Sequence, residues 1–228
     1  MLKVVKIGGN VVDNSEKLDR FLQDFASLEG PKVLVHGGGK IATTIGKALG
    51  IETQMIGGRR VTDAETLKVV TMVYAGLINK TIVAKLRTAG CNAVGLCGAD
   101  GGLIVSRRRN PKPVDYGFVG DPELERFGTA TAKTLIDAGY TLVVAPITVD
   151  GADYTLRSFE LHQIVDGLDF ISNTYYCKDI TTESPAAKVG LYSEMFSFTV
   201  SDFSCVGDDD EQTAKAVETQ IGGLGTIA

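Results

Sequence analysis

Residues 2–9, LKVVKIGG, and residues 32–39, KVLVHGGG, share one design, which is a short apolar run that ends in glycines. Each run has the length of a buried strand, and the glycines interrupt the strand pattern. Residues 16–28 place apolar side chains at helical spacing, and residues 40–49 resume helical character. Strand, glycines and helix therefore occur twice in succession, a pattern typical of a parallel sheet in an α/β fold.

The rest of the chain continues this alternation. We expect helices over about 63–89 and 129–138, strands over 92–97 and 141–147, a loop at 57–61, and hairpin material within 103–120. Thr62 and Glu65 have the spacing of a capping box and would open the long helix. The sequence therefore predicts an α/β protein, a three-layer α/β/α sandwich with a mainly parallel central sheet.

Composition restricts the class of protein and its compartment. The chain has 228 residues, of which 44% are hydrophobic and 22% charged, as in soluble globular proteins. No apolar run approaches the roughly 20 residues of a membrane helix, and the first residues lack a signal-peptide pattern. Four widely spaced cysteines without a CxxC pair favour a reduced, cytoplasmic location, and two histidines exclude a His-rich metal site.

Charge is distributed unevenly along the chain. Residues 1–150 carry 19 Lys and Arg against 15 Asp and Glu, whereas residues 151–228 carry 4 against 13. A net charge of -5 does not suggest a nucleic-acid partner. If the protein binds an anion, we expect the first two thirds of the chain to bind it.

The glycines at the two strand ends are candidates for an anion site. After the first strand, Gly8 and Gly9 allow backbone N–H groups to approach an anion, and Lys6 adds a charge. The triple glycine that contains Gly38 and Gly39 comes before a helix, whose N-terminus attracts anions. A tight strand exit with a surface lysine and a flexible turn are the alternatives. Because both loops lie at the carboxyl edge of a parallel sheet, we expect a phosphate-related site there.

Other motifs are absent or less informative. The P-loop, GxGxxG, GxSxG and protein-kinase signatures do not occur. In the segment 58–63, GRRVTD, a guanidinium suits a carboxylate, although we expect Arg59 to be solvated. We also expect a solvated loop at 107–109 and a solvent-facing acidic run at 208–211. For His36 we favour a structural hydrogen bond over donation to phosphate.

Several ordered stretches together resemble the amino-acid kinase family, and within it the kinases that act on N-acetyl-L-glutamate. The stretches are Lys6-Ile7-Gly8-Gly9, Val35-His36-Gly37-Gly38-Gly39, residues 58–63, residues 74–80 (YAGLINK), 94–96 (VGL), 114–120 (VDYGFVG) and 143–147 (VVAPI). They cover about residues 2–156.

The resemblance implies a function for the chain and a role for individual residues and for each lobe. It implies transfer of phosphate from ATP, accompanied by Mg²⁺, to the side-chain carboxylate of an N-acyl-L-glutamate in arginine biosynthesis, in a homodimer or higher homo-oligomer. Lys6 would be catalytic and would bind phosphate with Gly8 and Gly9. Gly38 and Gly39 would bind the substrate or the transferring phosphoryl group, and Arg60 would bind the α-carboxylate. Residues 1–150 would form the acylglutamate-binding lobe and residues 151–228 the nucleotide-binding lobe.

The last third departs from the family pattern. Where relatives carry Asn-x-Asn-Ala-Asp, residues 156–161 read LRSFEL, and residues 220–225, QIGGLG, lack the methionine and lysine of the family's Gly-Gly-Met-x-x-Lys segment. We therefore expect a shortened, atypical nucleotide-binding lobe. Two alternatives to the acetylglutamate kinase remain open, namely an N-succinylglutamate kinase and a non-catalytic, amino-acid kinase-like binding protein.

Overall fold

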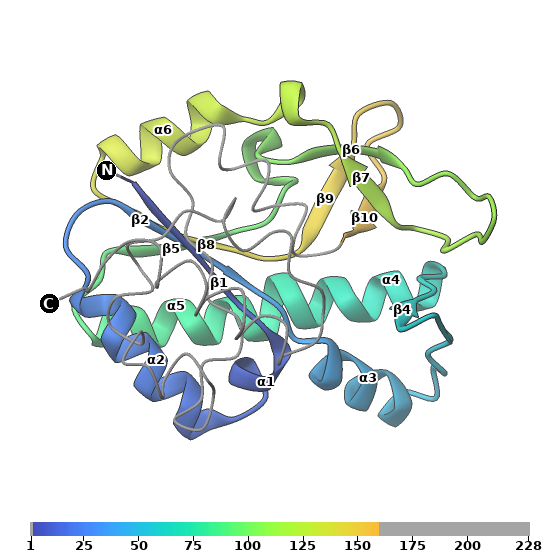
Figure 1. Cartoon of the computed structure of the whole chain (residues 1–228), viewed down its shortest axis with the longest axis horizontal. Coiled ribbons are helices and arrows are strands. Elements are labelled where there is room, and N and C mark those ends of the chain that lie inside the picture. Colours follow the sequence, from blue (N-terminus) through green and yellow to red (C-terminus); the bar gives the residue numbers. More distant parts are fainter. Residues whose placement is uncertain (1, 160–228) are drawn as a thin grey trace, which may run out of the picture.

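A four-stranded parallel sheet forms the centre of the molecule. The computed structural model describes residues 2–159, and Figure 1 shows the elements of this part. The strand order is β1-β2-β8-β5, and the strands span Lys3–Ile7, Lys32–His36, Thr141–Val144 and Ala93–Leu96 respectively. All three neighbouring pairs are parallel, which confirms the predicted sheet type.

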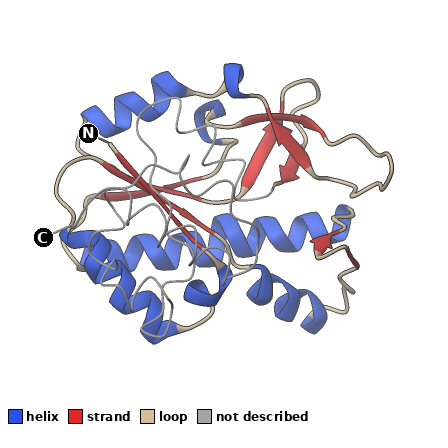
Figure 2. Ribbon diagram, viewed as in Figure 1, coloured by secondary structure: helices blue, strands red, loops and turns tan. Residues whose placement is uncertain are grey.

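Helices lie on both faces of this sheet and give the predicted three layers (Figure 2). On one face lie α2 (Ser15–Ser27) and α5 (Asn79–Thr88), and α6 (Thr129–Asp137) lies on the other. The short α1 (Gly9–Val12) and the ten-residue α3 (Gly39–Ala48) follow β1 and β2 directly. The predicted order of strand, glycines and helix is therefore observed twice.

The strands are apolar because each of their faces is covered. Side chains alternate across a strand, so Val5 and Ile7 enter the core beneath α2 and α5, while Val4 enters the core on the α6 side. Strand β2 is buried along its whole length. Fully burying one such aliphatic side chain contributes about 1.5–3 kcal/mol. Two-sided burial explains why these segments are continuous apolar runs and do not alternate with polar residues.

A second sheet stands beside the carboxyl end of the first. Its order is β10-β9-β6-β7, with bounds Leu156–Ser158, Ile147–Asp150, Val105–Arg108 and Gly120–Pro122. The expected strand at 141–147 is therefore two strands in different sheets. The chain leaves the first sheet at Ala145-Pro146, where proline has no N–H to continue a ladder. The expected hairpin within 103–120 is confirmed by the antiparallel pairing of β6 with β7.

Residues 57–61 differ from the expected loop. Met55–Ile56 (β3) and Arg59–Arg60 (β4) pair as a small antiparallel hairpin. Gly57 and Gly58 form its turn with φ of +56° and +75°, which only glycine adopts at little cost. The hairpin was missed because two-residue strands carry too short a pattern to detect.

The long helix is observed, although its start and its middle differ from the prediction. Helix α4 (Ala64–Thr71) continues as a π-helix, η1 (Met72–Ile78), into α5. The N-cap is Asp63, whose carboxylate accepts the Thr66 N–H at 2.7 Å, so the Thr62–Glu65 capping box was wrong. Thr62 is buried, and its hydroxyl lies 3.1 Å from Ser158 Oγ.

The stretch Ala64–Thr88 is long and apolar enough to cross a membrane by length and composition alone. Its apolar residues Val70, Val73 and Ile82 belong to the core, and charged residues such as Lys68 lie on the outside. The core helix of a soluble protein passes the same test, so this one helix is weak evidence of a membrane span. Among the described residues, Cys91 and Cys97 are free thiols.

A hairpin crosses the lobe boundary predicted at residue 150. Strand β9 pairs with β10 across it, and Arg157 Nε donates to Asp150 Oδ2 at 2.6 Å with both side chains buried. The C-terminal lobe, the acidic run 208–211 and the segment 220–225 lie outside the described residues. The division into two lobes thus stays a prediction.

Candidate functional site

A pocket of about 380 Å³ opens beside the carboxyl ends of β1 and β2. This volume lies within the range of small-molecule sites, roughly 300–1,000 Å³. The pocket is lined by Gly9, Gly37, Gly38, Gly39, Met55, Gly58, Arg59, Arg60, Thr62, Val70, Tyr74, Arg109, Tyr116, Val119, Pro146, Ser158 and Phe159. The predicted residues Gly9, Gly38, Gly39 and Arg60 therefore surround one cavity.

The two glycine loops lie side by side because their strands are neighbours. Ile7 is opposite His36 in the register of β1 and β2, and the Gly37 N–H donates to the Ile7 carbonyl at 3.1 Å. One residue beyond each loop, Lys40 Nζ donates to Asn10 Oδ1 at 2.7 Å. Gly8 is the N-cap of α1 and does not line the pocket. Adjacent strand ends thus produce the predicted convergence of the loops.

Gly38 has a conformation that disfavours a side chain, and Ile78 fills the space beside it. Its φ is +150°, and a Cβ at this position would meet Ile78 Cδ1 at 2.1 Å. Gly39 begins α3, whose first N–H groups have no acceptor within the helix. With the positive end of the helix dipole, these N–H groups form a surface suited to an anion.

Lys6 is buried in β1 and does not line the pocket. It alternates with Ile7, so its side chain leaves the sheet on the same face as Val4, away from α2 and α5. It lies one residue before Ile7, whose carbonyl holds the second loop. The alternative of a surface lysine at this position is wrong.

Arg60 links the β3–β4 hairpin to the start of α3. Its Nη2 donates to the Gly39 carbonyl at 2.9 Å and to Thr43 Oγ1 at 2.8 Å, and its Nη1 donates to Thr53 Oγ1 at 2.9 Å. Burial raises the pKa of the neighbouring Tyr74 hydroxyl, and Arg60 partly opposes that rise. Arg60 therefore faces the pocket while it orients the Gly39 carbonyl.

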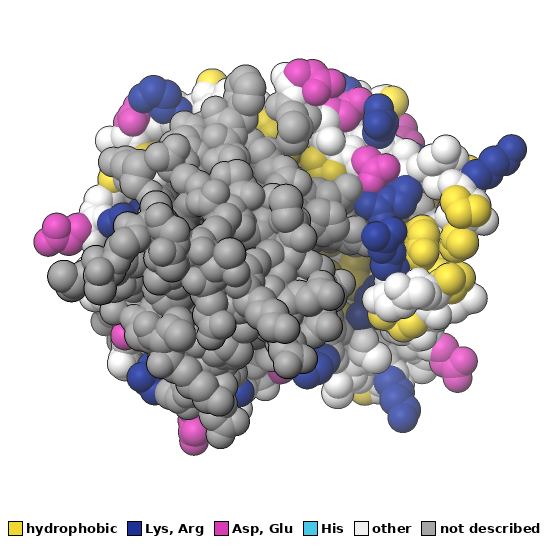
Figure 3. Space-filling view, in the orientation of Figure 1, with side chains coloured by type: hydrophobic (Ala, Val, Ile, Leu, Met, Phe, Trp, Pro, Cys, Tyr) yellow, Lys and Arg dark blue, Asp and Glu magenta, His cyan; other side chains and the backbone are white. Residues whose placement is uncertain are grey.

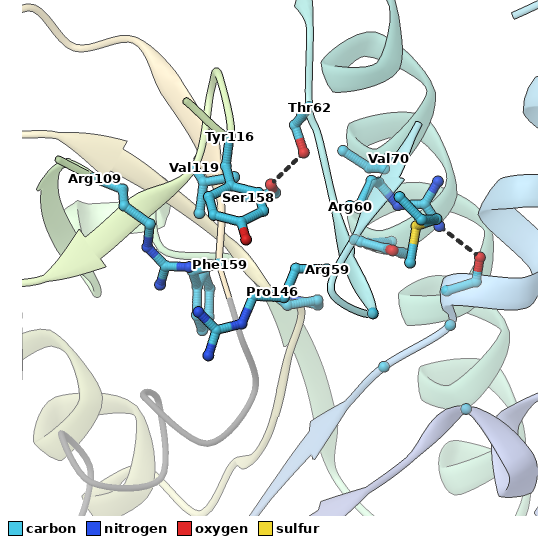
Figure 4. A pocket seen from close by; sticks show the side chains of 17 residues that line it. Arg59, Arg60, Thr62, Val70, Arg109, Tyr116, Val119, Pro146, Ser158 and Phe159 are labelled. Atoms are coloured by element: carbon cyan, nitrogen blue, oxygen red, sulfur yellow. Dashed lines mark hydrogen bonds between the residues drawn. The ribbon is translucent and has the colours of Figure 1, made fainter. Parts of the chain in front are cut away.

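The opposite wall comes from the second sheet and from residues 114–120. Figure 4 shows Arg109, Tyr116, Val119 and Ser158 on this side, across the pocket from Arg60. Arg109 is only 13% exposed and pairs with Asp121 at 2.8 Å, so the expected solvated loop at 107–109 was wrong at this position. Arg107 and Arg108 are exposed, within strand β6. Arg59 is exposed as expected, yet it also points into the pocket (Figure 4).

The pocket is therefore positively charged, with three arginines in its lining. Figure 3 shows lysine and arginine side chains gathered beside apolar ones on one face of the molecule. Within residues 2–159, no group of three or more His, Cys, Asp or Glu side chains could hold a metal ion. The site can bind an anionic small molecule through arginines and helix N–H groups.

His36 is fully buried and does not line the pocket. Its Nδ1 lies 3.0 Å from the Gly37 carbonyl and its Nε2 3.1 Å from Asn79 Nδ2. Burial lowers its pKa to about 4, so the ring is neutral at physiological pH. The expected structural hydrogen bond is thus observed.

The lining residues that were not predicted from the sequence include Arg109, Tyr116, Ser158 and Phe159. The segment 114–120 was noticed only through its resemblance. Its Gly117 lies so close to Thr62 that a Cβ would meet the Thr62 carbonyl oxygen at 2.3 Å. A glycine between two aromatic residues, as in Tyr116-Gly117-Phe118, was the one sequence signal that the backbone approaches another segment closely here.

Comparisons with known proteins identify the family of the chain. The model of the amino acid kinase family matches residues 1–159. The acetylglutamate kinase of Cytophaga hutchinsonii is 58% identical over 151 residues, covering 66% of this chain and 56% of that protein. The acetylglutamate kinase of Bacteroides fragilis is 55% identical over 157 residues, covering 69% of this chain and 59% of that protein. The chain therefore spans less than two thirds of the length of these curated relatives.

Solved structures support the fold. N-acetylglutamate synthase from Neisseria gonorrhoeae, complexed with coenzyme A and N-acetyl-glutamate, superposes with a TM-score of 0.65 at 18% identity. This match covers 95% of the chain and 51% of that protein. Aspartokinase III from Escherichia coli, in complex with aspartate and ADP, gives a TM-score of 0.56 at 11% identity, covering 79% of this chain and 49% of that protein.

Proposed function

The chain belongs to the amino acid kinase family, and we propose that it transfers the terminal phosphoryl group of ATP to the side-chain carboxylate of N-acetyl-L-glutamate. The convergence of the triple glycine and Arg60 on one pocket carries the proposal. The acetylglutamate kinases that are 55–58% identical support the acetylated substrate over the alternatives. A cytoplasmic enzyme of arginine biosynthesis would follow.

The pocket suggests a role for each proposed acceptor-binding residue. The guanidinium of Arg60 would bind the α-carboxylate of the acceptor, because it faces the pocket and is held by Gly39 and two threonines. The N–H groups at Gly38 and Gly39 would bind the reacting carboxylate or the transferring phosphoryl group. Both contacts require the loop to keep its position, since a displacement of about 1 Å costs on the order of 100-fold in rate.

The phosphate-binding residues would act from the neighbouring strand end. Gly8 and Gly9 would donate N–H groups to the phosphates of ATP, and Lys6 would offset charge on the transferring group. A carboxylate acceptor is already ionised near neutral pH, so the reaction needs no general base. The residues would therefore act through alignment and charge.

Mg²⁺ enters this proposal only as the counter-ion of ATP, and no step is assigned to it. The described residues supply no cluster of metal-ligating side chains, and Mg²⁺ commonly keeps water and phosphate ligands. The division into an acylglutamate-binding lobe at 1–150 and a nucleotide-binding lobe at 151–228, and a homo-oligomeric state, complete the proposal on the resemblance alone.

An assay of ADP release tests this function. The purified chain should release ADP when N-acetyl-L-glutamate is present and not with unmodified L-glutamate, while N-succinyl-L-glutamate should be a poorer acceptor. Lys6→Ala should abolish the release, and Lys3→Ala, in the same strand, should leave it within about twofold because Lys3 Nζ donates to the Glu29 carbonyl at the other end of the strand. Acceptor-independent ADP release, or full activity in Lys6→Ala, would contradict the proposal.

A further inference from the structure

The π-helix η1 brings three residues of the long helix to the triple-glycine loop. In an α-helix, residues five apart are separated by about 140° around the axis, and the wider π turn reduces this angle. Tyr74 and Asn79 are five apart within and just after η1. Tyr74 lines the pocket, Ile78 underlies Gly38, and Asn79 reaches His36. The π-helix thus directs Tyr74, Ile78 and Asn79 toward the triple-glycine loop.

Asn79 is held in a single orientation. It is fully buried, and its Nδ2 lies 3.0 Å from the Val143 carbonyl and 3.1 Å from His36 Nε2. Its Oδ1 accepts from Lys80 Nζ at 3.1 Å. A carbonyl oxygen only accepts and an ammonium only donates, so exchanging the amide oxygen and nitrogen would break both contacts. The Asn79 amide nitrogen therefore donates to His36.

This orientation fixes the proton on His36. Because Nε2 accepts from Asn79, the proton of the neutral ring is on Nδ1, which donates to the Gly37 carbonyl at 3.0 Å. Burial, with a smaller contribution from the charge of nearby Lys80, lowers the pKa of His36 to about 4. The ring therefore keeps one tautomer across the physiological range.

We propose that Asn79 and His36 are positioning residues, which hold the Gly37 carbonyl so that the N–H groups of Gly38 and Gly39 face the acceptor. The inference rests on the proposed function, because it assigns those N–H groups to the acceptor. The loop is fixed at one end by Ile7 and His36 and at the other by Arg60 on the Gly39 carbonyl. Three successive glycines have too much backbone freedom to keep one shape without such restraints.

Two substitutions of His36 separate its two hydrogen bonds. In His36→Asn, the side-chain amide can replace Nδ1 and still donate to Gly37. In His36→Gln, the longer amide replaces Nε2 and loses the bond to Gly37. We expect kcat/KM for N-acetyl-L-glutamate to fall on the order of 100-fold in His36→Gln and less than about tenfold in His36→Asn, with the KM for ATP little changed in both. Equal loss in the two variants at equal thermal stability would overturn the proposal.

Nuclear magnetic resonance tests the same inference without turnover. The chain has two histidines, so long-range ¹H–¹⁵N spectra are simple, and His162→Gln assigns the second signal. We expect His36 to carry its proton on Nδ1 and to show no titration between pH 8 and pH 5. We also expect the Gly38 and Gly39 amide signals to shift in His36→Gln.

The two experiments separate this inference from the proposed function. A wild-type chain without acetylglutamate-dependent ADP release would contradict the function, while the tautomer and the glycine amide shifts would still test the positioning role. Conversely, an active wild type with an Nε2–H tautomer, or with glycine amides unmoved in His36→Gln, would overturn the positioning role alone.

Discussion

The two walls of the pocket offer different chemistry to a ligand. The glycine wall, which consists of Gly37–Gly39 and the β3–β4 hairpin, offers backbone N–H groups and two arginines. One of these, Arg60, is held by the Gly39 carbonyl and two threonine hydroxyls. The side-chain wall, formed by Arg109, Tyr116, Ser158 and Phe159, offers side chains from the second sheet. Backbone N–H groups bind a ligand only when the loop keeps its shape, whereas a binding side chain can be substituted without moving the backbone. We therefore expect the backbone of the glycine wall to control turnover, and the side chains of both walls, Arg60 included, to adjust affinity.

Gly38→Ala should have the largest effect. The new Cβ would lie 2.1 Å from Ile78 Cδ1 at a φ of +150°, so we expect a loss of about 3 kcal/mol in stability and more than 100-fold in kcat. Urea unfolding and ADP release measure the two effects. Gly50→Ala is the matched control, because Gly50 also has positive φ but no atom within 4 Å of the added Cβ. Near-normal kcat in Gly38→Ala would contradict the glycine wall's role.

Arg60→Lys should come next. Lysine keeps the charge but loses the bonds to Gly39 and the two threonines, so we expect the KM for the acceptor to rise about 30-fold. Steady-state kinetics at saturating ATP measure this change. Arg87→Lys, at an exposed position on α5, controls for the exchange itself. An unchanged acceptor KM would remove Arg60 from the proposed binding set.

The sequence predicted the glycine wall and missed the side-chain wall for a physical reason. Strand β1, its glycines and α2 are encoded by neighbouring residues, and local periodicity reveals them. Arg109 and Ser158 reach the pocket only through pairing of β6, β9 and β10, which joins segments that are far apart in the chain. The Thr62 hydroxyl is bonded to Ser158, 96 residues away, so a local capping rule misplaced it. The π-helix has a pattern too close to that of an α-helix to detect in seven residues.

Arg109→Gln tests whether the side-chain wall affects acceptor affinity more than turnover. It removes a mostly buried guanidinium that pairs with Asp121, and we expect the acceptor KM to rise about tenfold with kcat within about twofold. Arg108→Gln is the control, since its side chain is 53% exposed and outside the pocket lining. A larger loss of kcat than of affinity would show that this wall also positions the reacting groups.

Acid should weaken the Asp150–Arg157 ion pair next to the side-chain wall and so lower the free energy of unfolding, with little change near neutral pH. Burial alone would raise the pKa of Asp150, but the Ala152 N–H and the Arg157 guanidinium outweigh it and hold that pKa below 3.8. The Asp150 carboxylate therefore stabilises the fold above about pH 3.8, and this contribution is lost as pH falls through the lowered pKa. Urea unfolding of wild type and Asp150→Asn should differ by a constant amount from pH 7 to pH 5 and converge in stronger acid. A difference that grew in acid would reverse this sign.

Gly95 has a consequence for how this sequence can vary. It lies in strand β5, where a Cβ would come within 2.0 Å of Asn79 Oδ1, and its carbonyl accepts from Lys80 Nζ. An alanine there would displace Asn79 and so release His36, although Gly95 itself touches no ligand. We therefore expect homologues that keep asparagine at position 79 to keep glycine at position 95.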